Sequence, residues 1–206
     1  MKIYNNLYNL IISPENILAA WKTFKSDKRK KPDVARFERE LEQNIFQLYR
    51  DLKNHVYTHG QYKSFWIRDP KLRNIYKATV RDRVLHHAMF SVLNPVFEPT
   101  FISTSFSCRV GKGTHKGVFY LRDTVRQVSA NYTKRCYVLK CDIRKFFETI
   151  DHEILTQILE KRIKDVGTMG LLKEVIGSYA RPATERERER ERERELASLR
   201  DARVYP

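Results

Sequence analysis

The sequence predicts a helix-rich α+β fold in which one β-hairpin and one buried strand stand among several helices. Over long stretches, apolar residues recur at spacings of three and four, which is typical of amphipathic helices. Between residues 61 and 77 polar and aromatic residues mix with a shorter period, as expected for a hairpin. A largely apolar run at residues 137–143 is typical of a buried strand. With 206 residues, 41% of them hydrophobic, the chain can bury one sizeable core.

Two helices are expected before the hairpin. Ser13, Pro14 and Glu15 supply an N-cap, a first-turn proline and an acid that suits the helix dipole, which predicts a helix through Phe24. A basic linker occupies residues 25–32. Asp33 is then expected to cap one long helix that runs to Leu52, because apolar residues recur there at three and four. The simplest interpretation of that stripe is core packing.

The hairpin is expected to have strands at residues 62–68 and 73–77, joined by a turn that starts at Asp69 and Pro70. Its basic residues are Lys63, Arg68, Lys71, Arg73 and Lys77. A helix over residues 81–93 should follow, and Pro95 should end it.

The second half begins with a polar, glycine-containing loop at residues 105–115. A helix over residues 115–130 should follow, with an inward face made of Val118, Leu121, Val125 and Val128. After the predicted strand at 137–143, two more helices are expected, over residues 151–164 and 171–178. Residues 181–206 contain a tract of alternating Glu and Arg with no apolar residue to pack, which predicts a low-complexity, disordered tail.

The charge indicates a polyanionic partner. The chain has 40 basic and 25 acidic residues, a formal net charge of +15, and the alternating tail supplies only +1 of it. A globular segment this basic repels itself unless a polyanion neutralises it, and nucleic acid is the expected polyanion because binding releases condensed counterions. The alternative is a soluble basic protein that binds no nucleic acid.

Other classes of protein are disfavoured. No apolar run approaches the roughly 18 residues needed to span a bilayer, and the first residues lack the pattern of a signal peptide, so a cytoplasmic protein without a membrane partner is expected. Cys108, Cys136 and Cys141 have no metal-binding spacing and are expected to be reduced thiols.

Four stretches carry a further signal, and their order along the chain is part of it. They are Arg81-Asp82-Arg83-Val84 with the histidines that follow, residues 93–101, the loop 105–115, and the run Leu139-Lys140-Cys141-Asp142-Ile143-Arg144-Lys145-Phe146-Phe147 that continues to His152. Together they resemble prokaryotic reverse transcriptases of the group II intron, retron and diversity-generating retroelement type. The stretches span about half of the chain, and the last is the most specific.

This resemblance implies an RNA-directed DNA polymerase and a division of the chain into four parts. Residues 1–60 would form an N-terminal helical arm, 61–135 the fingers, 136–180 the first part of the palm, and 181–206 the tail. It also implies an RNA template, a DNA or RNA primer, deoxynucleoside triphosphates, and two Mg²⁺ ions in the intact enzyme, with Mn²⁺ as a substitute. No oligomeric state is implied.

The resemblance makes Asp142 the first metal ligand and catalytic carboxylate, assisted by the backbone carbonyl of Ile143. Mg²⁺ favours such hard oxygen ligands. The alternative role for an aspartate after a strand is a helix N-cap. Phe147 matches the aromatic gate that clashes with a 2′-hydroxyl, with a core aromatic as its alternative. Asp151 is expected to cap the next helix.

The resemblance also assigns nucleotide-binding roles. Arg73 matches the hairpin arginine that holds the triphosphate, a task for which a planar guanidinium is suited. Lys71 is a second candidate, and Arg109 is placed near the nucleotide and template. The residues expected to contact nucleic acid are Lys63, Arg68 and Lys112, and their alternative is a solvated surface.

One expected motif is absent. The family carries two adjacent aspartates on a later palm hairpin, and this sequence contains no two consecutive acidic residues. The two-metal route needs those carboxylates, so the chain is expected to be inactive alone. The alternative functions are a non-catalytic RNA- or DNA-binding module and an accessory subunit of a partner polymerase. Asp82 and Arg83 are interpreted as structural residues that join fingers to palm.

Overall fold

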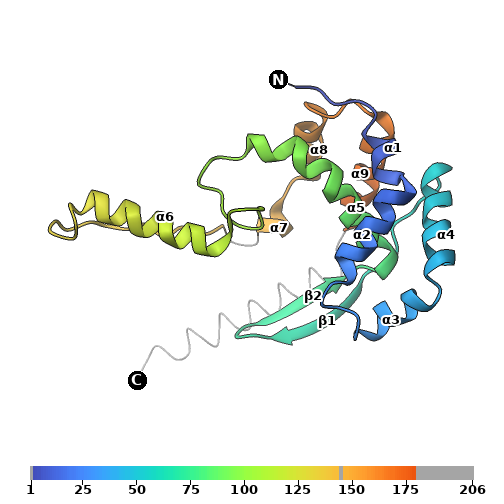
Figure 1. The fold of residues 1–206 in the computed structure, drawn as a ribbon, viewed down its shortest axis with the longest axis horizontal. Helices are drawn as coiled ribbons and strands as arrows, with labels where there is room; N and C mark the ends of the chain where they lie inside the picture. The colour runs from blue at the N-terminus through green and yellow to red at the C-terminus, as the bar shows by residue number, and fades with distance from the viewer. Residues whose placement is uncertain (1, 144–145, 180–206) are drawn as a thin grey trace, which may run out of the picture.

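The structure is a computed structural model that describes residues 2–143 and 146–179. It is rich in helices and contains one two-stranded antiparallel sheet, which confirms the predicted α+β class (Figure 1). The predicted tail at residues 181–206 lies outside the described residues. The elements are α1 Leu7–Ile12, α2 Pro14–Lys25, α3 Pro32–Arg39, α4 Leu41–Lys53, β1 Lys63–Arg68, β2 Leu72–Lys77, α5 Val80–Phe97, the 3-10 turn η1 Glu98–Thr100, α6 Gly113–Val128, α7 Phe146–Thr149, α8 His152–Glu160 and α9 Val166–Ser178.

The core forms where α5 packs against the N-terminal helices α1, α2, α3 and α4. Side chains that are almost completely buried come from each of these helices, among them Ile11, Trp21, Val34, Leu48 and Leu85. Each such side chain contributes about 1.5–3 kcal/mol when it leaves water. The predicted first helix is confirmed, because Ser13 accepts a hydrogen bond from the backbone of Asn16 and α2 begins at Pro14.

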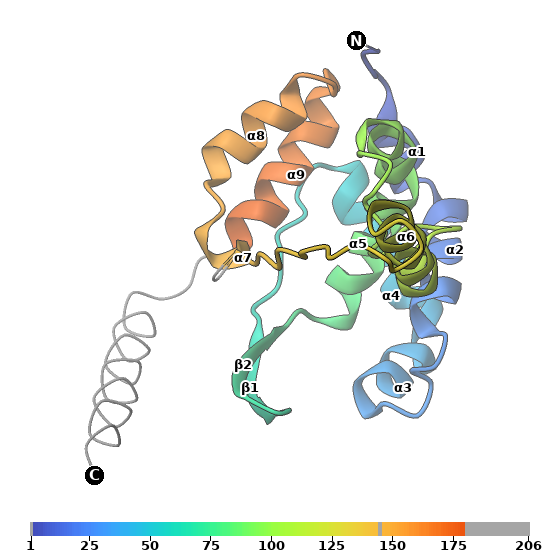
Figure 2. The ribbon, with the colours of Figure 1, turned by 90° about the vertical axis from the view of Figure 1, so that its left-hand side faces the viewer.

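The C-terminal helices α8 and α9 pack against each other and attach to the N-terminus of the chain. The Tyr4 backbone forms a bridge with this region, donating to the Arg162 carbonyl at 2.9 Å and accepting from the Lys164 N–H at 3.0 Å. The backbone N–H of Tyr8 donates to the Asp165 carboxylate at 2.7 Å. These contacts hold the N-terminal segment against the connection between α8 and α9, two helices that lie side by side in Figure 2.

The hairpin projects from the helical body (Figures 1 and 2). The predicted pairing is confirmed, with Lys63 opposite Lys77 at the base and Arg68 opposite Leu72 at the tip. All six residues of β1 are exposed, so few tertiary contacts cover the hairpin.

The predicted long helix is wrong in one respect: it is two helices. The backbone leaves the helical conformation at Glu40, with φ −115° and ψ 37°, and α3 ends there. The Asn44 side chain donates to the Phe37 carbonyl at 3.1 Å, which supplies a partner for a carbonyl near the break. The predicted Asp33 cap is also wrong, because the N-cap is Lys31 and Asp33 lies in the first turn.

Other helix boundaries differ from the predictions. Pro95 does not end α5, which continues to Phe97. A proline removes one backbone hydrogen bond, and because Pro95 lies near the C-terminal end of α5 the helix tolerates this loss. The helix α9 starts at Val166 rather than at residue 171, because Asp165 caps it by accepting from two backbone N–H groups. Asp151 caps α8 as predicted.

The largest corrections concern α6 and the segment that follows it. The predicted inward face of α6 is mostly solvent-exposed, with Val118 57% and Val128 65% exposed. Residues 137–143 form no strand, and Leu139 is 88% exposed. A strand needs a neighbour to satisfy its backbone groups, and no described segment pairs with this one. As a result α6 projects from the body, and the chain returns from its far end to α7 (Figures 1 and 2).

Within the described residues, no helix combines the length and the apolar character that crossing a bilayer requires.

The exposed apolar surface of α6 and residues 137–143 predicts self-association of the isolated chain. Apolar area that stays in water is stabilised when a second molecule covers it. Replacing both Val138 and Leu139 with Glu should therefore shift the chain toward monomer in sedimentation-velocity experiments. Replacing Val166, which is 86% exposed but outside this surface, with Glu is the matched control. A wild-type chain that is monodisperse and monomeric at high concentration would contradict the prediction.

Candidate nucleic-acid interface

The hairpin presents its basic residues to solvent. Lys63, Arg68, Lys71 and Arg73 are all exposed, and none of them forms an ion pair within the part of the chain that the structure describes. Directly opposite residues of an antiparallel pair share one face of the sheet. Arg73 lies opposite Ile67, so it shares a face with Lys63, whereas Arg68 lies on the other face. The predicted nucleic-acid contacts are therefore divided between the two faces of the hairpin.

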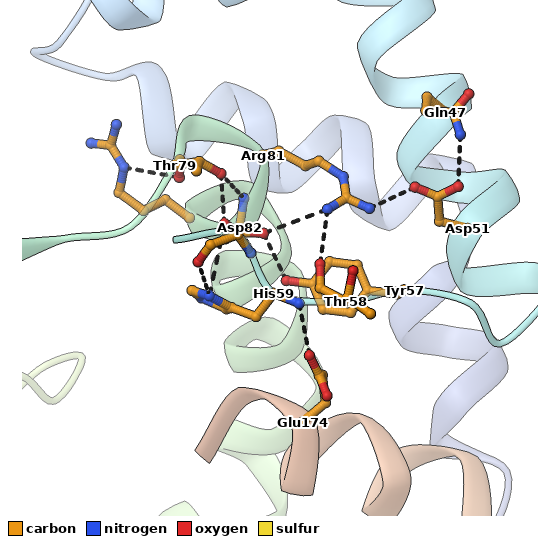
Figure 3. A network of polar contacts seen from close by, with 11 residues as sticks. Gln47, Asp51, Tyr57, Thr58, His59, Thr79, Arg81, Asp82 and Glu174 are labelled. Carbon is orange, nitrogen blue, oxygen red and sulfur yellow. Dashed lines mark hydrogen bonds and ion pairs between the residues drawn. The ribbon is translucent and has the colours of Figure 1, made fainter. Parts of the chain in front are cut away.

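A buried carboxylate holds the base of the hairpin to the helical body (Figure 3). Asp82, in the first turn of α5, is fully buried. It accepts hydrogen bonds from the Tyr57 hydroxyl at 2.8 Å, the Thr79 hydroxyl at 2.6 Å and the Gly60 backbone N–H at 3.2 Å. Burial, followed by the hydrogen bond to Asp82, raises the pKa of the Tyr57 hydroxyl. Asp82 is structural, as predicted, because the buried Tyr57 hydroxyl would otherwise be unsatisfied.

Gly60 is required at this position because the backbone passes close to Asp82. A Cβ atom on residue 60 would lie 2.9 Å from a carboxylate oxygen of Asp82 and 2.9 Å from the Thr79 methyl group. Such distances are shorter than real Cβ contacts, so any side chain at residue 60 would force the Asp82 and Thr79 side chains or the adjoining backbone to shift.

The network around Asp82 extends to α4 and α9. Arg81 pairs with Asp51 of α4 at 2.6 Å and donates to the Thr58 carbonyl at 3.2 Å. The backbone N–H of His59 donates to the Glu174 carboxylate at 2.8 Å (Figure 3). The segment before the hairpin is thus fixed to α4, α5 and α9. The sequence alone does not reveal these contacts, because the residues that make them lie far apart in the chain.

Three stacked rings continue this anchor toward β1. The His59 ring lies between those of Tyr62 and His86, with centroid distances of 4.8 and 5.3 Å. The Nδ1 atom of His59 donates to the Gly60 carbonyl at 2.7 Å. The Nε2 atoms of His59 and His86 are buried and have no hydrogen-bond partner among the described residues. Burial, together with the neighbouring His59, lowers the pKa of His86 to about 4, so the ring is neutral at neutral pH.

The loop at residues 105–113 is held by Arg109. Its guanidinium makes a bidentate contact with Glu98, with distances of 2.6 and 2.9 Å to one carboxylate oxygen, and it donates to the carbonyls of Ile102 and Ser105. The hydrogen bond from Arg109 lowers the pKa of Glu98. The sequence did not indicate a role for Glu98, because an acid eleven residues before a loop arginine gives no local signal of their contact. The arginine predicted to contact the nucleotide is therefore engaged by the protein itself.

Lys112 and the loop glycines have defined positions. The Lys112 ammonium donates to the Ser103 carbonyl at 2.6 Å and lies over the Phe106 ring. Gly111 and Gly113 have φ angles of 71° and 79°, which favour glycine. The Gly113 N–H donates to the Phe106 carbonyl at 2.9 Å, so the loop is closed on itself before α6 begins.

Asp142 and Phe147 lie on the exposed segment around α7. The Asp142 carboxylate accepts from the backbone N–H of Ile143 at 3.0 Å. Phe147 is 78% exposed and contacts Phe146 edge to face, so it is not a core aromatic. The described residues contain no group of three or more side chains that could hold a metal. No hydrogen bond or ion pair joins Asp142 to the hairpin cations in the described ranges, and α7 and the hairpin are separate features in Figure 1.

Comparisons with known proteins point to intron-encoded proteins. No protein-family model matches the chain. The chain is 26% identical over 106 residues to the protein YkfC of Escherichia coli. It is 27% identical over 93 residues to the mitochondrial nuclear intron maturase 1 of Arabidopsis thaliana. It is 21% identical over 173 residues to the group II intron-encoded protein LtrA of Lactococcus lactis.

These matches cover different shares of the chains. They include 52%, 45% and 80% of this chain, respectively, but 27%, 12% and 27% of the relatives. The chain therefore corresponds to about a quarter or less of each relative's length. A match that includes 80% of 206 residues must contain the hairpin, the loop and Asp142. At this low identity the chain is similar to group II intron-encoded proteins in the region of the candidate interface.

Replacing Asp82 with Ala should lower the free energy of unfolding by about 3 kcal/mol, because the buried Tyr57 hydroxyl and two partly buried donors lose their acceptor. Urea denaturation monitored by circular dichroism measures the change. Asp123→Ala is the matched control, since Asp123 is an exposed helical aspartate paired only with its neighbour Arg122, and it should cost less than about 0.5 kcal/mol. Equal effects in the two variants would contradict the anchoring role of Asp82.

His86 should make the chain less stable in mild acid. A histidine whose pKa is lowered by folding stabilises the fold above its unfolded pKa, and this contribution is lost as the pH falls toward the folded pKa of about 4. Between about pH 7 and pH 5 the loss should be about 2 kcal/mol. The titratable and charged groups whose charges act on the ring are His59, Asp82, His87 and Arg83.

Urea denaturation at the two pH values measures this loss in the wild type and in His86→Gln. The variant should lose less stability on acidification, whereas His115→Gln, which changes an exposed histidine of α6, should behave as the wild type. An identical pH dependence in all three proteins would rule out His86 as the source.

Proposed function

We propose that this chain is the RNA-binding front part of an RNA-directed DNA polymerase related to group II intron-encoded proteins. Residues 1–60 would be its helical arm, 61–135 its fingers and 136–180 the beginning of its palm. The observation that carries the proposal is the similarity to LtrA, which extends over 80% of the chain and includes the hairpin and Asp142. The net charge of +15 supports a polyanionic partner.

In this proposal the hairpin supplies the main contacts to phosphates. Lys71 and Arg73 lie at and after the turn and are exposed, so an incoming triphosphate or an RNA backbone can reach them. Lys63 and Arg68 lie on opposite faces of the hairpin, so they would contact the RNA backbone from its two sides. Arg109 acts as a positioning residue, because its contact with Glu98 holds the loop in place. Lys112 fastens the same loop to the Ser103 carbonyl.

Asp142 and the backbone carbonyl of Ile143 are the proposed ligands for Mg²⁺ or Mn²⁺. The fit is partial: both are oxygen donors of the kind that Mg²⁺ prefers, but the exposed Asp142 belongs to no group of three or more potential metal-ligating side chains among the described residues. The ion, when bound, would stabilise charge on the transferred phosphoryl group. Phe147 would contribute an exposed ring that contacts the sugar of the incoming nucleotide.

A non-catalytic binding module is the second candidate, and the absence of adjacent acidic residues favours it for the chain on its own. The two candidates share the RNA contacts and differ in the role of Asp142. Metal binding at Asp142 is meaningful only for polymerisation, whereas RNA binding through the hairpin does not need it.

RNA binding through the hairpin is tested by fluorescence anisotropy with a labelled single-stranded RNA. The double variant Lys71→Gln/Arg73→Gln should bind more weakly, with a slope of log K against log salt that is shallower by about 1.4, because two phosphate contacts are lost. The control Lys22→Gln/Arg39→Gln removes the same charge from exposed positions on α2 and α3 and should keep the wild-type slope. Equal losses in both double variants would indicate general electrostatic attraction rather than a hairpin interface.

Metal binding at Asp142 is tested by NMR with Mn²⁺ as a paramagnetic probe. Signals of residues around Asp142 should broaden in the wild type and not in Asp142→Asn, because the amide binds the ion far more weakly than a carboxylate. Asp142→Asn should leave RNA affinity unchanged. Identical broadening in both proteins would remove Asp142 from the metal site and leave the binding module as the function.

A further inference from the structure

A cleft lies at the base of the hairpin, away from its tip. It has a volume of about 620 Å³ and is bounded by α3, the start of α4, the first residue of β1, the last residue of β2 and the first turn of α5. Cavities of a few hundred cubic ångströms are the size that small-molecule ligands occupy. None of the site residues assigned above lies in it except Lys63.

The cleft has more positive charge than its own carboxylates neutralise. Lys63 and Lys77 lie directly opposite each other across the hairpin, an arrangement in which like charges repel. Lys77 pairs with Asp33 at 2.7 Å, but Asp33 also pairs with Arg83 at 2.6 Å. One carboxylate thus serves two cations, and Lys63 forms no ion pair with it.

The pKa of Asp33 agrees with this count of charges. Burial alone would raise it, but the hydrogen bonds from Lys77 and Arg83 outweigh burial and leave it lowered. Asp33 is therefore ionised at neutral pH, and it is already committed to its two partners.

Two cations of the cleft are available to a ligand. Arg36, on α3, and Lys63, at the start of β1, both line the cleft and are exposed, and neither forms an ion pair among the described residues. The other acid of the wall, Glu40, pairs with neither of them in that part of the chain. A bound anion would relieve the repulsion between Lys63 and Lys77 and would meet a guanidinium suited to two phosphate oxygens.

The remaining walls are apolar or belong to a helix start. The half-buried Phe37 faces the cleft from α3, and it packs on Trp21 of the core with ring centroids 5.2 Å apart, which fixes its position. The first residues of α5 contribute the positive end of an 18-residue helix. A ligand that combines a phosphate with a flat apolar group matches these walls.

We propose that this cleft binds a nucleoside phosphate, with the phosphate between Arg36 and Lys63 and the base against Phe37. The phosphate can belong to a nucleic-acid strand or to a free nucleotide, since the chemistry is the same. If it belongs to a strand, the inference rests on the proposed RNA-binding function, and the cleft is a second contact that leads the strand along the base of the hairpin, separate from Lys71 and Arg73.

The test compares Arg36→Gln/Lys63→Gln with the control Lys22→Gln/Arg39→Gln in the full 206-residue chain. The probes are a fluorescein-labelled single-stranded RNA, followed by anisotropy, and adenosine monophosphate, followed by ligand-observed NMR. For the RNA, the cleft variant should weaken binding and lower the slope of log K against log salt by about 1.4, while the control keeps the slope. The substitutions lie on exposed side chains, and a thermal melt monitored by circular dichroism checks that both proteins are folded.

The outcomes separate the two proposals. Weaker RNA binding in the cleft variant alone, without a signal from adenosine monophosphate, assigns the cleft to a strand. Loss of an adenosine monophosphate signal in the cleft variant alone assigns it to a free nucleotide. Wild-type binding of both probes by the cleft variant overturns the inference and leaves the proposed function intact if Lys71→Gln/Arg73→Gln still weakens RNA binding. A wild-type chain that binds neither probe overturns both.

Discussion

The fully buried carboxylate of Asp82 is the interaction on which the arrangement of this molecule depends. A charged group without water is tolerated only where donors surround it, and here they come from Tyr57, Gly60 and Thr79. These residues precede and follow the hairpin along the chain, so a single carboxylate holds both ends of the hairpin. The same α5 packs on four N-terminal helices, and through it the hairpin takes its position from the core.

The hairpin and the cleft at its base follow from this anchor. The strands leave apolar side chains such as Phe65, Trp66 and Leu72 exposed, and a two-stranded hairpin is marginally stable in isolation. Because Asp82, the stacked ring of His59 and the ion pairs of Asp33 hold its base, the cations at its tip can remain free of protein partners. The structure thus divides its basic residues into a set that supports the fold, such as Arg81 and Arg83, and a set that faces solvent.

The region from α6 to α7 has a different character. Most of its apolar residues are exposed, and residues 137–143 have the composition of a strand but pair with no other segment in the described part of the chain. Asp142 lies in this segment, and Phe147 follows it in α7. The candidate catalytic residues therefore lie in an exposed segment with few tertiary contacts. The candidate RNA contacts lie on the hairpin, whose base is anchored to the helices.

Local signals in the sequence determined much of the fold. Ser13 and Asp151 cap helices as predicted, and the alternating residues around Asp69 and Pro70 predict the hairpin, whose register the structure gives. These elements depend on hydrogen bonds and turns between residues close in the chain, which a sequence displays directly. The family resemblance proposed Asp142 as a metal ligand, but it could not predict the surroundings of that residue.

Only the tertiary structure decided which patterned segments find a partner and which charges remain free. The apolar run 137–143 and the stripe of α6 have patterns suited to burial, but burial needs a second surface, and none of the described elements provides one. In the same way, the sequence alone does not distinguish Arg109 from Arg36. In the structure Glu98 forms an ion pair with Arg109, whereas Arg36 lines an open cleft. Periodicity and composition report what a residue could do, whereas contacts between residues distant in the chain determine what it does.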